Sequence, residues 1–99
     1  MNKGGYVYIM ASVNRRTLYV GVTSNLAKRT WEHRTKVYPD SYTAKYNCVQ
    51  LVYYSHFGNI IDVIAEEKRI KGGSRQDKEV LINAMNYNWD DLYDNILTT

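Results

Sequence analysis

The sequence is poor in the features that would allow several kinds of protein. Its 99 residues include one cysteine and one proline, and no apolar run approaches the ~18 residues of a membrane helix. The single Cys48 excludes an internal disulfide, and its place in a β-prone run predicts a small buried side chain instead of a zinc ligand. Because no signal-peptide core follows the first residues, we expect a soluble, cytoplasmic protein without a membrane partner.

The surplus of positive charge is also small, at +3, so the placement of the charges matters more than their total. Lysine and arginine recur between residues 15 and 36 and again between 68 and 78, whereas Asp90, Asp91 and Asp94 gather near the end. Such basic segments suit a polyanionic partner, but ordinary solvated helix faces have the same composition. Charge alone therefore does not decide the function.

The pattern of apolar residues predicts a single α/β domain over residues 1–99. Strand-like segments at 5–11, 17–23 and 48–54 alternate with helical patterns at 25–36, 60–71 and 75–86. Capping residues precede the helical patterns: Ser24 or Asn25, then Gly58-Asn59, then Ser74 with Asp77. The segment 37–47 is predicted to be a loop, and its tyrosines suggest a cover for a ligand.

Two short runs near the N-terminus predict a β-hairpin, Tyr6-Val7-Tyr8 and Tyr19-Val20-Gly21. We expect Tyr8 to pair with Tyr19 across a four-residue turn. Alternation along the strands then puts both phenols on one face, where Gly21 leaves space beside them. The sequence therefore predicts a small hollow bordered by two tyrosines.

Glu67 is an acidic residue on the apolar stripe of a predicted helix. It follows Ile60, Val63 and Ile64 at helical spacing. A carboxylate that faces inward must be paired, hydrogen-bonded or bound to a metal. We therefore expect a cation to meet Glu67.

Arg29 and His33 lie four residues apart, on one face of the first predicted helix. A guanidinium fork suits a phosphate group, and a neutral imidazole can orient a water molecule or a phenol. Taken singly, such residues are more often a surface arginine and a packed histidine. The pair gains a functional meaning only in combination with the other residues.

In their order and spacing, these residues resemble the GIY-YIG nuclease superfamily, specifically its small stand-alone bacterial branch and the N-terminal catalytic domain of excision-repair endonucleases. Tyr6-Val7-Tyr8 stands where the family has Gly-Ile-Tyr, and Tyr19-Val20-Gly21 where it has Tyr-Ile-Gly. The segment 25–33 is similar to the family's Asn-Leu-x-x-Arg-x-x-x-His helix, and Glu66 to Lys71 is similar to its Glu-Lys-x-Ile-Lys run. The resemblance spans nearly the whole chain.

The resemblance implies a small central antiparallel three-stranded sheet flanked by helices. It also implies that five catalytic side chains converge on a phosphodiester: Tyr8, Tyr19, Arg29, His33 and Glu67. Glu67 would hold one Mg²⁺ or Mn²⁺ ion, which would stabilise the leaving 3′ oxygen. Tyr8, assisted by Tyr19 or His33, would accept a proton from the attacking water.

The implied function is that of a metal-dependent endonuclease that hydrolyses phosphodiester bonds in DNA, directed by the structure of the nucleic acid, in repair, recombination or mobile-element processing. RNA remains open as a substrate, and the chain is expected to be a monomer or a weak homodimer. The alternatives are a nucleic-acid-binding module without cleavage and, after it, a protein-interaction domain. We expect basic and aromatic side chains to hold the nucleic acid: Lys28, Lys36, Tyr42, Lys45, Lys71 and Arg75.

Overall fold

The computed structural model of the protein describes residues 4–98. Its centre is a three-stranded sheet of β1 (Gly5–Ser12), β2 (Leu18–Thr23) and β3 (Cys48–Phe57), in the order β2-β1-β3 with both pairings antiparallel. This confirms the predicted sheet. Among residues 4–98, no helix is long and apolar enough to cross a membrane.

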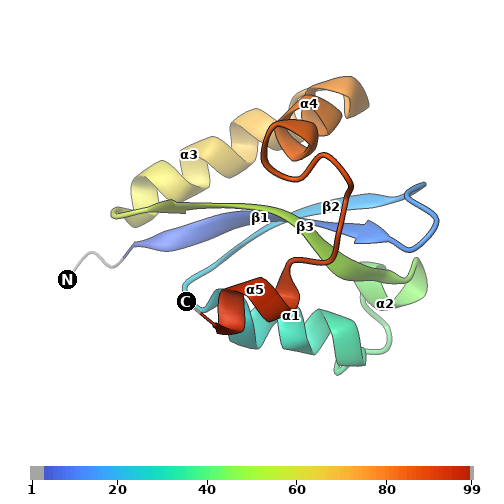
Figure 1. The fold of residues 1–99 in the computed structure, drawn as a ribbon. Helices are drawn as coiled ribbons and strands as arrows, with labels where there is room; N and C mark the ends of the chain where they lie inside the picture. The colour runs from blue at the N-terminus through green and yellow to red at the C-terminus, as the bar shows by residue number, and fades with distance from the viewer. Residues whose placement is uncertain (1–3, 99) are drawn as a thin grey trace.

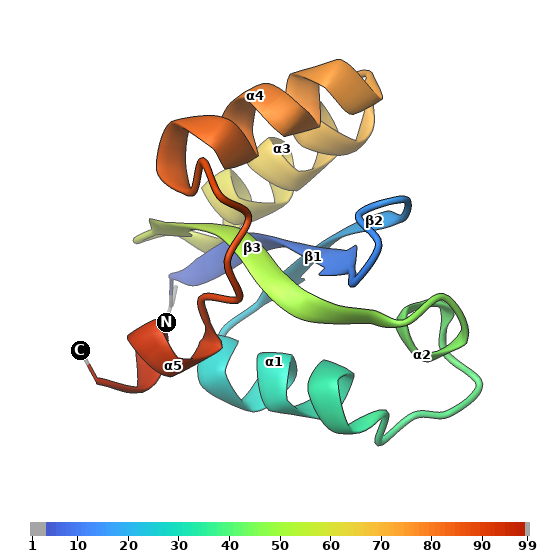
Figure 2. The ribbon, with the colours of Figure 1, turned by 45° about the vertical axis from the view of Figure 1, so that its right-hand side comes forward.

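Helices cover both faces of the sheet. Figure 1 shows α3 (Ile60–Lys71) and α4 (Arg75–Met85) on one side, and α1 (Leu26–Thr35) and α5 (Tyr93–Leu97) on the other. The short α2 (Tyr42–Lys45) lies between the end of α1 and the start of β3, as Figure 2 shows. The segment 37–47, predicted to be a loop, therefore contains one helical turn.

The central strand β1 supplies both hydrophobic cores because its side chains alternate between the two faces. Val7 and Ile9 face α3 and α4 and are fully buried there with Val63, whereas Tyr8 and Met10 face α1. Cys48 joins the second core with no exposed surface, which confirms its predicted burial. Burial raises the pKa of its thiol to about 11, so it stays protonated.

The helices begin at the predicted caps. The side chain of Asn25 accepts from the backbone N–H of Lys28, and Asn59 caps α3 in the same way through Ile61. Ser74 and Asp77 form the full capping box of α4. A further cap, Ser41, begins the unpredicted α2, since its hydroxyl accepts from the N–H of Ala44.

The predicted pairing of Tyr8 with Tyr19 is wrong. Tyr8 lies opposite Gly21, and Tyr19 lies opposite Met10. The turn lies one residue later in the chain than expected, because Ser12 bonds to Thr17 through both its backbone and its hydroxyl. The shift moves each partner by two residues, so Tyr8 and Tyr19 still share a face, as predicted.

The apolar stripe of α3 is narrower than the sequence pattern predicts. Val63 and Ile70 form the buried line, at 0% and 3% exposed, whereas Ile64 is 43% exposed. Glu67 lies at the margin of the buried face, with 18% of its side chain exposed. Its expected cation is Lys71, whose amino group lies 3.0 Å from a Glu67 carboxylate oxygen.

Candidate active site

A buried hydrogen bond joins strand β1 to helix α1. The hydroxyl of Tyr8 lies 2.8 Å from Nε2 of His33. Tyr8 is 1% exposed and His33 is 4% exposed, so the pair is shielded from bulk solvent. The antiparallel pairing and the inner face of α1 bring together two residues that are far apart in the sequence.

Gly21 makes room for the Tyr8 ring. A side-chain carbon at position 21 would lie 2.5 Å from the Tyr8 hydroxyl oxygen and 2.6 Å from the ring carbon that bears it. It would also lie 3.0 Å from the ring of Tyr19. Contacts this short are repulsive, so the glycine of the Tyr19-Val20-Gly21 run is a packing requirement of the two tyrosines.

The ring of His33 continues the chain of hydrogen bonds into α2. Its Nδ1 lies 2.8 Å from Oγ1 of Thr43, and this oxygen lies 3.2 Å from Oγ of Ser41. Thr43 is 2% exposed. The sequence prediction did not include Thr43 or Ser41 in the site, because no local pattern indicates that either of them lies near His33.

Burial sets the protonation of the two central groups. It raises the pKa of Tyr8 far above its ordinary value; the neighbouring Tyr19 adds to this effect and the positive charge of Arg29 opposes it. Burial, together with the charge of Arg29, lowers the pKa of His33 to about 4. At neutral pH the phenol is therefore protonated and the imidazole is uncharged.

Tyr19 and Arg29 border this buried pair on the more open side. The ring centroid of Tyr19 lies 6.3 Å from that of Tyr8 and 5.5 Å from that of His33. Arg29 is one helical turn before His33, with its guanidinium 3.1 Å from a Glu32 carboxylate oxygen and 30% of its side chain exposed. Four of the five predicted catalytic residues are thus brought together, and a polar ligand can reach Arg29.

Glu67 approaches from the opposite face of the sheet, on α3. Its partner Lys71 lines a hollow of about 370 Å³ at the edge of β2, together with Tyr19 and Tyr42. The hollow also contains Leu18, Val20 and Lys78 in its wall. Lys71 and Tyr19 therefore share one hollow at the sheet edge, whereas Glu67 lies on the helix that covers the other face of the sheet from the buried pair (Figure 1).

The chemistry of this donor set fits a hard cation that the substrate helps to bind. Residues 4–98 contain no group of three or more histidine, cysteine or acidic side chains that could hold a metal ion. Mg²⁺ is commonly held by one or two carboxylates, with water and substrate phosphate oxygens completing its shell. The partly exposed carboxylate of Glu67 meets that description.

The predicted nucleic-acid-binding residues differ in how far other groups of the protein already engage them. Lys28 and Lys45 are exposed, and Lys45 lies 5.6 Å from the ring centroid of Tyr46. Lys36 donates to the Asn47 side chain. Arg75 instead holds the β1–β2 turn, because it donates to the carbonyl oxygen of Arg16 at 2.7 Å and to that of Arg15. Its role in binding nucleic acid stays a prediction.

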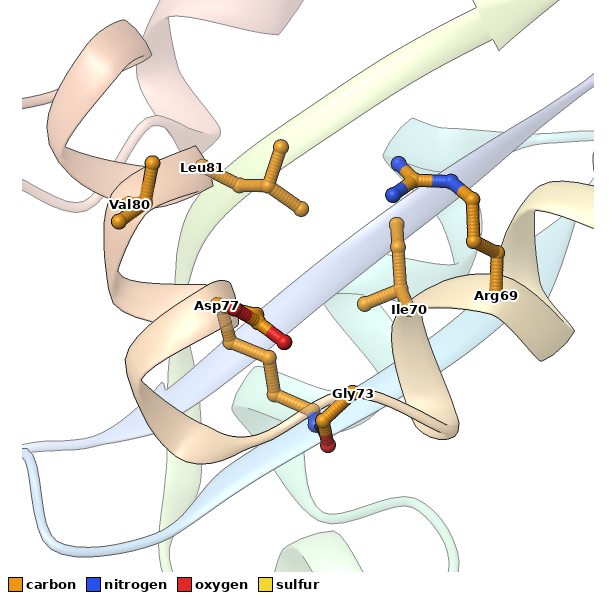
Figure 3. Close-up of a pocket in the computed structure, with 7 residues that line it drawn as sticks. Arg69, Ile70, Gly73, Asp77, Val80 and Leu81 are labelled. Atoms are coloured by element: carbon orange, nitrogen blue, oxygen red, sulfur yellow. Dashed lines mark hydrogen bonds between the residues drawn. The ribbon is translucent and has the colours of Figure 1, made fainter.

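A second hollow, of about 360 Å³, lies between α3 and α4. Figure 3 shows Asp77 and Leu81 of α4 on one side of it and Arg69 and Ile70 of α3 on the other. Its charged groups serve the helices themselves: Arg69 binds both carboxylate oxygens of Glu66, and the Asp77 carboxylate accepts from the backbone N–H of Ser74 in the capping box of α4. The chemistry therefore points to the tyrosine site and not to this hollow.

Comparison with known proteins shows the family to which the chain belongs. The model of the GIY-YIG catalytic domain family matches residues 4–81. A UPF0213 protein of Syntrophus aciditrophicus (strain SB) is 38% identical over 77 residues, which cover 78% of this chain and 87% of that protein. The solution structure of a UPF0213 protein from Bacillus halodurans has the same fold, with a TM-score of 0.57 and 24% identity over 89% of this chain and 92% of that one.

The matched residues include the whole sheet, α1 and α3, and with them Tyr8, Tyr19, Arg29, His33 and Glu67. The departures from the family signature, such as Tyr6 in place of its first glycine, remove none of these side chains. The chain belongs to the GIY-YIG family, whose catalytic domain is of the nuclease type and acts on nucleic acid.

Proposed function

We propose that the protein is a divalent-metal-dependent endonuclease that hydrolyses phosphodiester bonds in DNA. The proposal is based on the buried 2.8 Å contact between the Tyr8 hydroxyl and His33 Nε2, beside the partly exposed side chain of Arg29. Family membership supports a nuclease, and the arrangement of these groups supports phosphodiester hydrolysis. A directing role of DNA structure, in repair, recombination or mobile-element processing, belongs to the same proposal.

The proton acceptor in this scheme is Tyr8, with His33 as the group that receives its proton. Because burial keeps Tyr8 protonated, its hydroxyl donates to Nε2 of His33. Nδ1 of His33 then carries the ring proton and donates to Oγ1 of Thr43. As an attacking water gives up a proton to the Tyr8 oxygen, the phenol proton passes to Nε2, and no free phenolate is required.

Arg29 has two functions in the proposal. Its charge opposes the effect of burial on the pKa of Tyr8, which eases proton movement away from the phenol. With 30% of the side chain exposed, it also stabilises the negative charge that develops on the non-bridging phosphate oxygens. A donor aimed at such charge contributes about 2.7–4 kcal/mol to transition-state stabilisation. Reversing the charge of Arg29 is therefore expected to impair cleavage more than neutralising it.

Glu67 is the residue that would hold a Mg²⁺ or Mn²⁺ ion. GIY-YIG nucleases generally depend on a divalent metal ion. When bound, such an ion neutralises charge on the phosphate and on the leaving 3′ oxygen. Lys71, whose amino group lies 3.0 Å from a Glu67 carboxylate oxygen, holds the carboxylate in place before substrate binds.

The test is cleavage of labelled single-stranded, duplex and branched DNA in Mg²⁺ or Mn²⁺, with the wild type beside Glu67→Ala. Glu66→Ala is the matched control, because it removes a neighbouring carboxylate that is held by Arg69 on the same helix. We expect metal-dependent cleavage by the wild type and the control, and none by Glu67→Ala. Salt-sensitive binding without cleavage by any of them would replace the nuclease with a binding module on the same fold.

A further inference from the structure

A row of tyrosine rings leads from the buried site to the surface. The ring of Tyr19 lies 6.1 Å from that of Tyr42, which lies 4.7 Å from that of Tyr46. Tyr42 and Tyr46 are 51% and 44% exposed, so the hydrophobic cores do not account for them. The rings are tilted by 32° and 49° to one another, and rings tilted in this way leave part of each face uncovered.

A hollow lies at each end of this row. Tyr42 lines the 370 Å³ hollow at the β2 edge, whose wall includes Lys71 and Lys78. Tyr46 lines another of about 460 Å³, whose wall includes Arg34 and Lys36. Among the described residues, no acidic side chain lines either hollow. The aromatic row therefore crosses from one basic hollow to the next.

The basic side chains at the two hollows differ in how far a nearby carboxylate neutralises their charge. Lys71 is paired with Glu67 and Arg34 with Asp91, so each of them is partly neutralised. Lys36 donates to the neutral side-chain amide of Asn47 and keeps its whole charge. Lys45 extends from α2 to 5.6 Å from the Tyr46 ring centroid, so it brings a cation beside the exposed rings.

Resting on the proposed function, we propose that the row Tyr19, Tyr42 and Tyr46 is a stacking track for an unpaired strand, and that the substrate of this site is single-stranded nucleic acid. Unpaired bases stack on aromatic side chains without regard to sequence, while basic side chains bind the backbone. A continuous duplex cannot use these rings, because its base faces are already stacked. Lys36 and Lys45 contact phosphates on the way into the site.

The experiment is a binding titration in EDTA, where no cleavage occurs, with a labelled single strand of mixed sequence and the duplex formed from it. The variant Tyr46→Leu keeps an apolar side chain and removes the ring, and Tyr46→Trp restores a ring. Tyr87→Leu is the matched control, because Tyr87 is 81% exposed and belongs to neither hollow. A change at an exposed position leaves the fold intact.

We expect the wild type to bind the single strand more tightly than the duplex at equal salt concentration. Tyr46→Leu is expected to weaken single-strand binding about fivefold to a hundredfold, the range found when one stacking side chain is lost. Tyr46→Trp and Tyr87→Leu should bind as the wild type does. A preference for duplex, or equal losses in Tyr46→Leu and Tyr87→Leu, would overturn the track.

This result is independent of the cleavage result. Tyrosine-dependent binding of single strands by a protein that cuts no DNA in Mg²⁺ would retain the track and remove the nuclease. Glu67-dependent cleavage of duplex DNA that is unchanged in Tyr46→Leu would retain the nuclease and remove the track.

Discussion

Replacing Tyr8 with phenylalanine removes one oxygen atom from the centre of the proposed proton path and keeps the ring. The ring still fills the space that Gly21 leaves, so packing is conserved. The substitution removes the 2.8 Å hydrogen-bond partner of His33 Nε2, and the His33 side chain is buried. An unsatisfied buried group of this kind costs about 1–3 kcal/mol of folding stability. A small domain with ~5 kcal/mol or more of stability stays folded after such a loss.

The effect on cleavage should be much larger than the effect on folding. A positioned proton acceptor contributes roughly 10²–10⁴-fold to the rate of the chemical step. We therefore expect the single-turnover cleavage rate of Tyr8→Phe in saturating Mg²⁺ to fall by about that factor, with DNA affinity unchanged. Urea unfolding of the same sample measures the stability cost separately.

The matched control is Tyr6→Phe, which removes a hydroxyl two residues earlier on the same face of β1. The Tyr6 ring packs on Tyr54 and His56, outside the chain of hydrogen bonds. We expect this variant to cleave at nearly the wild-type rate. Cleavage by Tyr8→Phe within about tenfold of the wild type would refute Tyr8 as the proton acceptor, because a general base contributes more than that.

Three further predictions concern the surroundings of this pair. Because the pKa of His33 is lowered to about 4 in the folded state, its contribution to stability is present above pH 6.5 and is lost as pH falls toward 4. Urea unfolding should therefore show that the free energy of unfolding falls by about 2 kcal/mol between pH 7 and 5. This loss should be absent in His33→Gln. Gly21→Ala would place a carbon 2.5 Å from the Tyr8 oxygen and should cost about 1–3 kcal/mol in thermal or urea unfolding, whereas Gly58→Ala, with nothing within 4 Å, should not. Thr43→Val should slow single-turnover cleavage by removing the partner of Nδ1, and Thr43→Ser should restore the rate, because only the hydroxyl positions the ring.

The elements with strong local signals could be predicted from the sequence. Helix α3 occupies the predicted residues 60–71, because a capping asparagine precedes it and Gly72 ends it. Helix α2 was missed because four residues are too few to show a helical period. The hairpin register was wrong because the side chain of Asn14, which binds Ser12 and Arg16, sets the turn in a way that alternation alone does not indicate.

The candidate site was predictable where it depends on one element and not where it depends on packing between elements. Helical spacing placed Arg29 and His33 on one face of the helix, but only the packing of the fold buries His33 and leaves Arg29 partly exposed. The same spacing placed Glu67 inward, whereas the packing of α3 on the sheet leaves it at the margin. Thr43 touches His33 only because the segment after α1 turns back, and no local pattern records such a contact.

Two neighbouring residues of α2 point their side chains into different surroundings. Tyr42 presents its ring to the surface, while Thr43 turns inward and holds the imidazole of His33. Because the two residues are adjacent in one helical turn, the same short piece of backbone positions an exposed tyrosine ring and, through the His33 imidazole, the hydroxyl of Tyr8.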